Sequence, residues 1–162
     1  MVSPGQVNYL IPGTVAIGNA TISLSANSNT FTGKVDISNV APSIFSAASS
    51  GSGPAAAQVL TVTASGQVTT TNIFTTGAYA GGTDYIPTPV SLSPITNQVY
   101  LILYGTGFRN HSANPVEVTI NGVSVPVTYA GAQSTLPGLD QINVGPLPQT
   151  LAGTGKANLT SS

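Results

Sequence analysis

The sequence predicts an all-β protein built as a sandwich of β-sheets. The 162-residue chain contains no convincing stretch with apolar residues at the i, i+3, i+4, i+7 spacing of an amphipathic helix. Twelve prolines and eighteen glycines interrupt the chain every few residues. The runs between these breaks are rich in Val, Ile, Thr and Tyr, which favour strands. Short strands at this spacing are typical of sandwiches and barrels.

Ten segments combine strand-forming residues with a turn signal at their ends. The expected strands are 6–11, 20–25, 32–40, 57–63, 67–74, 98–105, 116–120, 123–128, 141–144 and 156–160.

Turn chemistry predicts two hairpins and one strand end. Asn121-Gly122 separates two alternating runs, and this pair favours a two-residue turn because both positions need a positive φ. The segment 64–66 (Ala-Ser-Gly) is expected to turn a second hairpin. Pro126 cannot donate a ladder hydrogen bond, so its strand should be an edge or should end there.

Two segments rich in small residues, 46–54 and 78–83, can be either domain connectors or ordinary surface loops. We predict three regions on this basis. Residues 1–45 form a partial sandwich unit that holds its last strands, 46–93 form a connecting β-hairpin region, and 94–162 form a second sandwich that lacks its final strand.

An internal repeat supports this organisation. Pro4-Gly5-Gln6-Val7-Asn8-Tyr9 is similar to Pro137-Gly138-Leu139-Asp140-Gln141-Ile142-Asn143-Val144, with Gln6 and Asn8 matching Gln141 and Asn143 at one offset of 135 residues (141 − 6 and 143 − 8). The segment 18–22 (Gly-Asn-Ala-Thr-Ile) then matches 155–159 (Gly-Lys-Ala-Asn-Leu).

The repeat predicts that both chain ends are incomplete. A further strand, 32–37, follows the first copy, whereas the chain stops at Ser162 soon after the second. Each end therefore resembles half of a sandwich, and we expect both ends to pair with other copies of the chain or with a longer parent. The residues expected in such assembly strands are Val7, Tyr9, Ile11, Val35, Ile37, Ile142, Val144 and Leu159.

The segments 98–108, 118–123, 129–131 and 137–143 resemble an uncharacterised Ig-like repeat domain at the C-termini of large secreted proteins of Acidobacteria. The Gly105-Thr106-Gly107-Phe108 element is also similar to the IPT/TIG branch of the Ig-like superfamily. The resemblance implies Ig-like β-sandwich repeats used for display, adhesion or assembly, and it implies no catalytic residues. That family normally continues through a final strand that is missing here.

The composition limits the classes of molecule that the chain is expected to bind. Charged residues make up 4 % of the chain, and three Lys and Arg residues are too few for the basic footprint of a nucleic-acid-binding protein. No apolar run is long enough to span a membrane. A nearly neutral surface favours association, so we expect a head-to-tail homo-oligomer. We expect a secreted, extracellular or cell-surface protein whose targeting segment has been removed.

The residues predict no enzyme, no cofactor and no metal site. Gly105-Thr106-Gly107-Phe108 lacks the spacing of a nucleotide-binding loop and is interpreted as a structural turn. His111, the only histidine, stands in a polar loop, and the chain contains no cysteine. The carboxylates are scattered, and only Asp84, in a short glycine-containing segment, is a weak candidate for calcium; they are Asp36, Asp84, Glu117 and Asp140.

The repeated amides Gln6, Asn8, Gln141 and Asn143, together with Asp140, can line a polar groove or can hold a loop by bonding to backbone, and the second role is favoured. The tyrosines Tyr100, Tyr104 and Tyr129 are expected in the core or at its rim, with each hydroxyl bonded at the edge.

Glycans are possible partners. Asn19, Asn110 and Asn158 each begin an Asn-x-Ser/Thr triplet, and Thr69, Thr70 and Thr71 could carry O-linked sugars. The first functional hypothesis is a structural subunit of an extracellular filament or pilus-like assembly, joined by strand exchange between neighbours. The alternative is a cell-surface or carbohydrate-binding module of a larger secreted protein.

Overall fold

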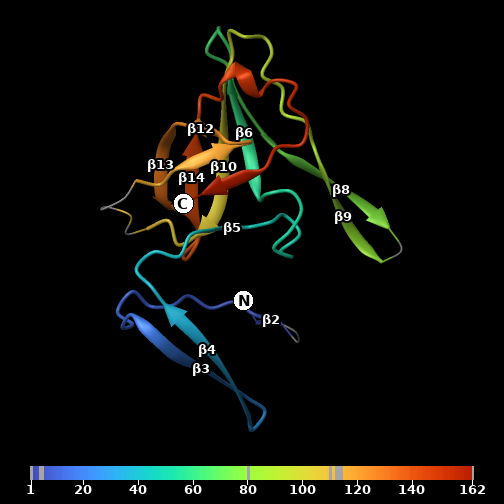
Figure 1. The fold of residues 1–162 in the computed structure, drawn as a ribbon. Coiled ribbons are helices and arrows are strands. Elements are labelled where there is room, and N and C mark those ends of the chain that lie inside the picture. The colour runs from blue at the N-terminus through green and yellow to red at the C-terminus, as the bar shows by residue number, and fades with distance from the viewer. Residues whose placement is uncertain (1, 4–5, 80, 110, 112–114, 162) are drawn as a thin grey trace. The chain divides into compact units, whose positions relative to one another are not determined.

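The computed structural model describes residues 2–3, 6–79, 81–109, 111 and 115–161 (Figure 1). These residues form strands and one three-residue 3₁₀ helix, η1 (Gln149–Leu151), and they contain no α-helix. The predicted all-β class is confirmed. The chain separates into two compact units, unit 1 (Met1–Ala41) and unit 2 (Pro42–Ser162).

Unit 1 consists of two small antiparallel ribbons. Strands β1 (Val2–Ser3) and β2 (Gln6–Val7) form one, and β3 (Gly18–Ala26) and β4 (Asn29–Ile37) form the other. The turn between β3 and β4 holds Asn27 and Ser28 at φ values of 48° and 64°, the geometry of a type I′ hairpin turn. None of the unit 1 side chains that the structure describes is buried.

The main sheet of unit 2 is antiparallel, in the order β13-β14-β10-β6-β7, and β5 pairs with the end of β10. In β10 buried residues alternate with half-buried ones, as expected for a central strand with one face in the core. The strands are β5 (Ser43–Ile44), β6 (Ala57–Val62), β7 (Val68–Asn72), β10 (Gln98–Thr106), β13 (Val127–Ala132) and β14 (Asp140–Val144).

A second sheet, in the order β12-β11-β15, supplies the other layer of the core. Its strands are β11 (Val118–Ile120), β12 (Val123–Val125) and β15 (Leu159–Ser161). Leu103 and Ile142 of the main sheet and Val118 of the small sheet are at most 1 % exposed and belong to one hydrophobic cluster. Unit 2 therefore has the β-sandwich core that the strand pattern predicts.

The turn predictions are confirmed. Asn121 and Gly122 have φ values of 50° and 78° between β11 and β12, and Gly66, at φ 82°, lies in the turn between β6 and β7. Pro126 stands where the chain leaves the small sheet and enters the main sheet as β13. Proline ends the pairing of β12 because it has no backbone N–H to donate.

The middle of the chain differs from the prediction. The region 46–93 is not a connection, because β6 and β7 complete the main sheet and the unit boundary lies at Ala41/Pro42. The segment 46–54 is a closed loop between β5 and β6, with a bridge from Ser46 to Ala55. The segment 78–83 belongs to a hairpin of β8 (Phe74–Tyr79) and β9 (Gly82–Pro87), which its glycines did not suggest.

Candidate functional site

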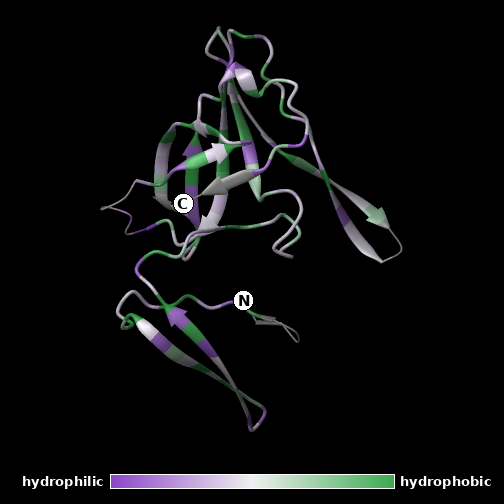
Figure 2. Cartoon of the chain, in the orientation of Figure 1, coloured by the Kyte–Doolittle hydropathy of each residue, from purple (hydrophilic) through white to green (hydrophobic). Residues whose placement is uncertain are grey.

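The hairpin of unit 1 is amphipathic. In its register Ala20 faces Val35 and Leu24 faces Phe31, and residues directly opposite each other share one face of a ribbon. The side chains of this apolar face are those of Ala20, Ile22, Leu24, Phe31, Val35 and Ile37. The other face carries only polar side chains, from Asn19, Thr21, Ser23, Ser25, Thr30, Thr32, Lys34 and Asp36. Figure 2 shows this alternation along both strands.

Within the described part of unit 1 the apolar face is only partly covered. Phe31 is 60 % exposed and Leu24 is 41 % exposed, while Ala20, Ile22, Val35 and Ile37 are half-buried. An isolated two-stranded ribbon is marginal in water because it buries too little apolar surface to offset its ordering entropy. The turn end of the apolar face, at Leu24 and Phe31, is therefore exposed apolar surface.

The predicted assembly residues of unit 1 fall in two places. Val35 and Ile37 belong to the apolar face, as stated above. Val7 lies opposite Val2 in β2, and Tyr9 and Ile11 follow it outside any strand, with exposures of 59 % and 39 %.

The predicted assembly residues of unit 2 behave differently. Ile142 and Val144 are fully buried in β14, which is paired with β10 on one side and β13 on the other. Their inclusion among assembly strands is thus corrected, because both backbone edges of β14 are occupied within the chain. Leu159 lies opposite Ile120 in β15, and within the described part of the chain β15 pairs with β11 alone.

The main sheet of unit 2 has a second surface, on the side opposite the core. Eight half-buried, uncharged side chains from β6, β10 and β14 form this outer face: Gln58, Leu60, Val62, Tyr100, Ile102, Tyr104, Gln141 and Asn143. The register places Tyr100 beside Leu60, and Ile102 between Gln58 and Asn143. Of the two places predicted for these tyrosines, the core and its rim, the structure excludes the core, because both rings lie on the outer face of the sheet.

Hydrogen bonds join the polar groups of the outer face. Tyr104 Oη donates to Gln58 Oε1 at 2.9 Å, and Gln58 Nε2 donates to Asn72 Oδ1 at 3.3 Å. Tyr100 Oη donates to Gln98 Oε1 at 3.0 Å. The expected hydroxyl partners are thus present, including Ala132 O for Tyr129 Oη at 2.6 Å.

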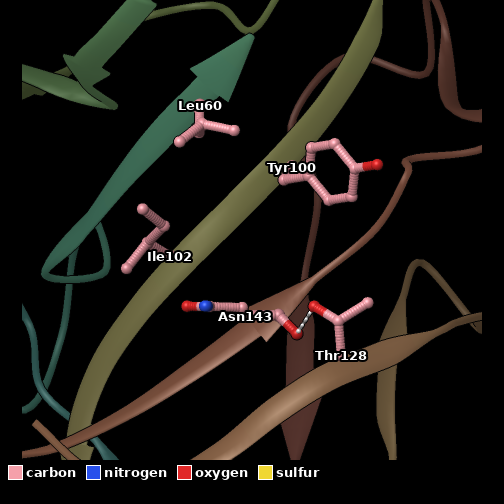
Figure 3. A pocket seen from close by; sticks show the side chains of 5 residues that line it. All are labelled: Leu60, Tyr100, Ile102, Thr128 and Asn143. Carbon is pink, nitrogen blue, oxygen red and sulfur yellow. Dashed lines mark hydrogen bonds between the residues drawn. The ribbon is translucent and has the colours of Figure 1, made fainter. Parts of the chain in front are cut away.

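Near the centre of the outer face lies a shallow depression of about 140 Å³. Figure 3 shows the five side chains that line it, those of Leu60, Tyr100, Ile102, Thr128 and Asn143. Thr128 Oγ1 donates to Asn143 O at 3.1 Å at the bulge of β13. The depression therefore combines aliphatic, aromatic, hydroxyl and amide groups without an ionised side chain.

Asp140 has a structural role. It is 2 % exposed, its Oδ2 accepts Phe108 N at 2.9 Å, and its Oδ1 accepts Arg109 Nε at 2.5 Å. These bonds hold the turn that buries Phe108 completely, with Gly107 at φ 78°. The structural interpretation of Gly105-Thr106-Gly107-Phe108 is confirmed. The loop is thus held by the carboxylate of Asp140 and not by the amides to which this role was assigned, since Gln141 Nε2 donates to the Asn143 side chain at 2.7 Å.

The titratable groups considered for chemistry lie apart. His111 Nε2 is 3.2 Å from Ala130 O, beside β13. Asp84 lies in the regular pairing of β9 opposite Gly77, and Asp36 lies in β4, so neither stands in a ligand loop. No cluster of three or more His, Cys, Asp or Glu side chains occurs among the described residues.

Two predicted glycosylation sites are exposed. Asn19 lies on the polar face of the hairpin. Asn158 precedes β15, where its backbone N–H is bonded to Asn121 Oδ1 at 2.8 Å. Asn110 lies outside the described residues, and Thr69, Thr70 and Thr71 are exposed on β7 at the edge of the sheet.

Comparisons of the chain with protein families, curated proteins and solved structures found no match. Across the residues that the structure describes, no helix has the length and apolar character needed to cross a membrane.

Proposed function

We propose that the chain is a structural subunit of an extracellular filament or pilus-like assembly. In this assembly the β3–β4 hairpin of one copy docks on the next copy, which covers the apolar face of the hairpin. The observation that carries this proposal is the apolar face of β3 and β4, which exposes Leu24 and Phe31 to solvent.

The energetic argument rests on burial. Covering a Leu or Phe side chain stabilises a protein by roughly 1.5–3 kcal/mol relative to leaving it in water. Leu24 and Phe31 face each other at the exposed end of the ribbon, so one docking event would cover both. A contact of this apolar face with a different surface of the next copy is heterologous, and such contacts propagate into fibres unless they close into a ring.

The repeat indicates where the next copy is engaged. The segment 18–22 at the start of β3 matches the segment 155–159 that leads into β15. In unit 2, β15 lies against β11, with Leu159 opposite Ile120. We therefore propose that β3 and β4 of one copy extend the β12-β11-β15 sheet of another, with the apolar face toward its core.

The surface chemistry supports close packing of many copies. The chain has three Lys and Arg residues against four Asp and Glu residues, so little charge repulsion opposes association. The polar face of the hairpin, rich in Thr and Ser, suits the solvent side of such an assembly.

The test compares two lysine substitutions on neighbouring residues of β3. Leu24→Lys places a charge on the apolar face, whereas Ser23→Lys places the same charge on the polar face. We expect wild type and Ser23→Lys to form filaments in negative-stain electron microscopy and large species in light scattering after gel filtration. Leu24→Lys should remain dispersed, because docking would bury its ammonium group unpaired.

Two results would contradict the proposal. One is a wild-type chain that stays monomeric at the highest attainable concentration. The other is equal assembly of the two lysine variants, which would remove the apolar face from the contact.

A further inference from the structure

We infer that the outer face of the main sheet in unit 2 binds an uncharged, linear polysaccharide, with the depression beside Tyr100 at its centre. This site lies on unit 2 and on the side of the sheet opposite the core. It is carried by observations separate from the apolar face of unit 1, so it goes beyond the proposed assembly.

The charge of the face selects the class of ligand. All eight outer-face side chains are uncharged at neutral pH, and their polar groups are amides and phenols. A phosphate-bearing or otherwise ionic ligand would lose its hydration without gaining an ion pair. Sugar hydroxyls, by contrast, both donate and accept, and so do amide side chains.

The apolar side chains of the depression suit the C–H groups on the faces of a sugar ring. The depression is lined by the Tyr100 ring together with Ile102 and Leu60 (Figure 3). A pyranose ring has C–H groups on its faces and hydroxyls at its rim. One face can therefore pack on these apolar side chains while the hydroxyls reach the surrounding polar groups. Tyrosine suits this role because it combines an apolar body with a polar end.

An amide group that can bond to a sugar hydroxyl lies beside these apolar side chains. Asn143 accepts the Gln141 Nε2 bond through its Oδ1, and its own Nδ2 group takes part in no hydrogen bond among the described residues. The paired amides and phenols also hold one another in place, which lowers the entropy lost when a ligand binds.

The extent of the outer face favours a polysaccharide over a single sugar. The face crosses strands β6, β10 and β14 and continues toward β7 and β13 at the edges. Five strands at about 4.8 Å spacing give a surface roughly 19 Å across, which exceeds one sugar ring. An extended β-1,4-linked polymer matches an open sheet better than a compact branched glycan does.

A protein partner fits this face less well. Leu60, Val62 and Ile102 are its aliphatic side chains, and all three are half-buried by their neighbours. The apolar face of unit 1 is the stronger candidate for a protein contact. Occupation of the outer face by a second copy of the chain is thus the competing outcome of the test.

The probe is hydroxyethylcellulose, a soluble uncharged β-1,4-glucan, in affinity electrophoresis of the full chain. Carboxymethylcellulose, with the same backbone and anionic groups, is the matched polymer. We expect the neutral polymer to retard the wild type more strongly. Tyr100→Ala should weaken binding about tenfold or more, as for truncation of a central aromatic contact. Asn143→Ala should weaken it several-fold.

Tyr85→Ala is the control, because Tyr85 packs on Phe74 in the β8–β9 hairpin and is not part of the outer face. Circular dichroism confirms that each variant is folded. Retardation should persist in the Leu24→Lys variant, which separates polymer binding from assembly. The inference is overturned if neither polymer retards the folded wild type, or if the anionic polymer retards it as strongly as the neutral polymer does. It is also overturned if Tyr100→Ala leaves retardation unchanged. Loss of assembly in Tyr100→Ala without polymer binding would instead assign the face to a contact between copies.

Discussion

The two copies of the repeated motif have similar sequences and opposite environments. In unit 2 the motif forms β14 in the middle of the main sheet, where Ile142 and Val144 are fully buried. In unit 1 the equivalent residues are Val7, in β2, and Tyr9, which is 59 % exposed. An alternating pattern is thus sufficient to favour a strand, whereas burial requires neighbouring strands and an opposing layer.

This comparison locates the stability of the chain. The core of unit 2 draws on both sheets, whereas unit 1 buries none of its described side chains. Apolar residues contribute to folding roughly in proportion to the area they remove from water. Covering unit 1 would therefore add to its stability, which is the physical basis of the proposed assembly.

The largest contrast should come from equivalent residues of the repeat. Ile142→Ala removes a fully buried side chain from the core and should lower the free energy of unfolding by about 3 kcal/mol. Val7→Ala, 135 residues earlier (142 − 7), should cost less than about 0.5 kcal/mol in a dispersed background such as Leu24→Lys. Urea unfolding followed by circular dichroism measures the free energy of unfolding of both variants. Equal losses would contradict the difference in burial between the two copies of the repeat.

Two glycines give the next contrast. A Cβ at Gly105 would lie 2.1 Å from Ser43 O and 2.6 Å from Phe108 Cε2, because β5 crosses close to β10 there. Gly105→Ala should therefore destabilise the chain by about 2–3 kcal/mol. A Cβ at Gly33 in β4 would meet nothing within 4 Å. Gly33→Ala should leave the melting temperature nearly unchanged, and a large loss there would show that unit 1 is tightly packed.

Two aspartates provide a third contrast. Asp140→Ala leaves the buried Phe108 N–H without its acceptor and should cost about 2 kcal/mol. Asp36→Ala, on the exposed polar face of β4, should change stability by less than about 0.5 kcal/mol. Thermal unfolding of both variants beside wild type checks the pair. A neutral Asp140→Ala would refute its role in holding the turn.

The smallest effect should come from the turn of unit 1. Ser28 has a φ of 64°, which glycine adopts with less strain. Ser28→Gly should stabilise the hairpin by about 0.5 kcal/mol. Amide hydrogen exchange in the dispersed Leu24→Lys background should show slower exchange in β3 and β4 only. Faster exchange in these strands would contradict the turn geometry.

Much of the secondary structure was predictable because its signals are local. Asn121-Gly122 defines its hairpin through two positive φ values, and Pro126 ends β12 because it lacks an N–H. The β8–β9 hairpin was missed because its glycines and polar residues weaken the alternation, while pairing across the turn still satisfies its backbone.

The candidate sites were predictable only in part. Val35 and Ile37 were identified from their strand pattern, and the structure places them on the uncovered face. Asn143 was a candidate for a polar groove, but the outer face as a whole was not identified, because Gln58, Tyr100 and Asn143 come together only through the register of β6, β10 and β14. The tyrosines were expected in the core or at its rim, because an aromatic ring is apolar and its hydroxyl needs a partner.

The sequence by itself determined the all-β class, most strand positions and the main turns, since these depend on the conformational preferences of neighbouring residues. Tertiary structure decided which of two similar strands is buried, which face of each sheet meets water and which distant residues share a surface. Those outcomes depend on contacts between segments far apart in the chain, such as Ile102 with Gln58 and Asn143, and no local pattern encodes them.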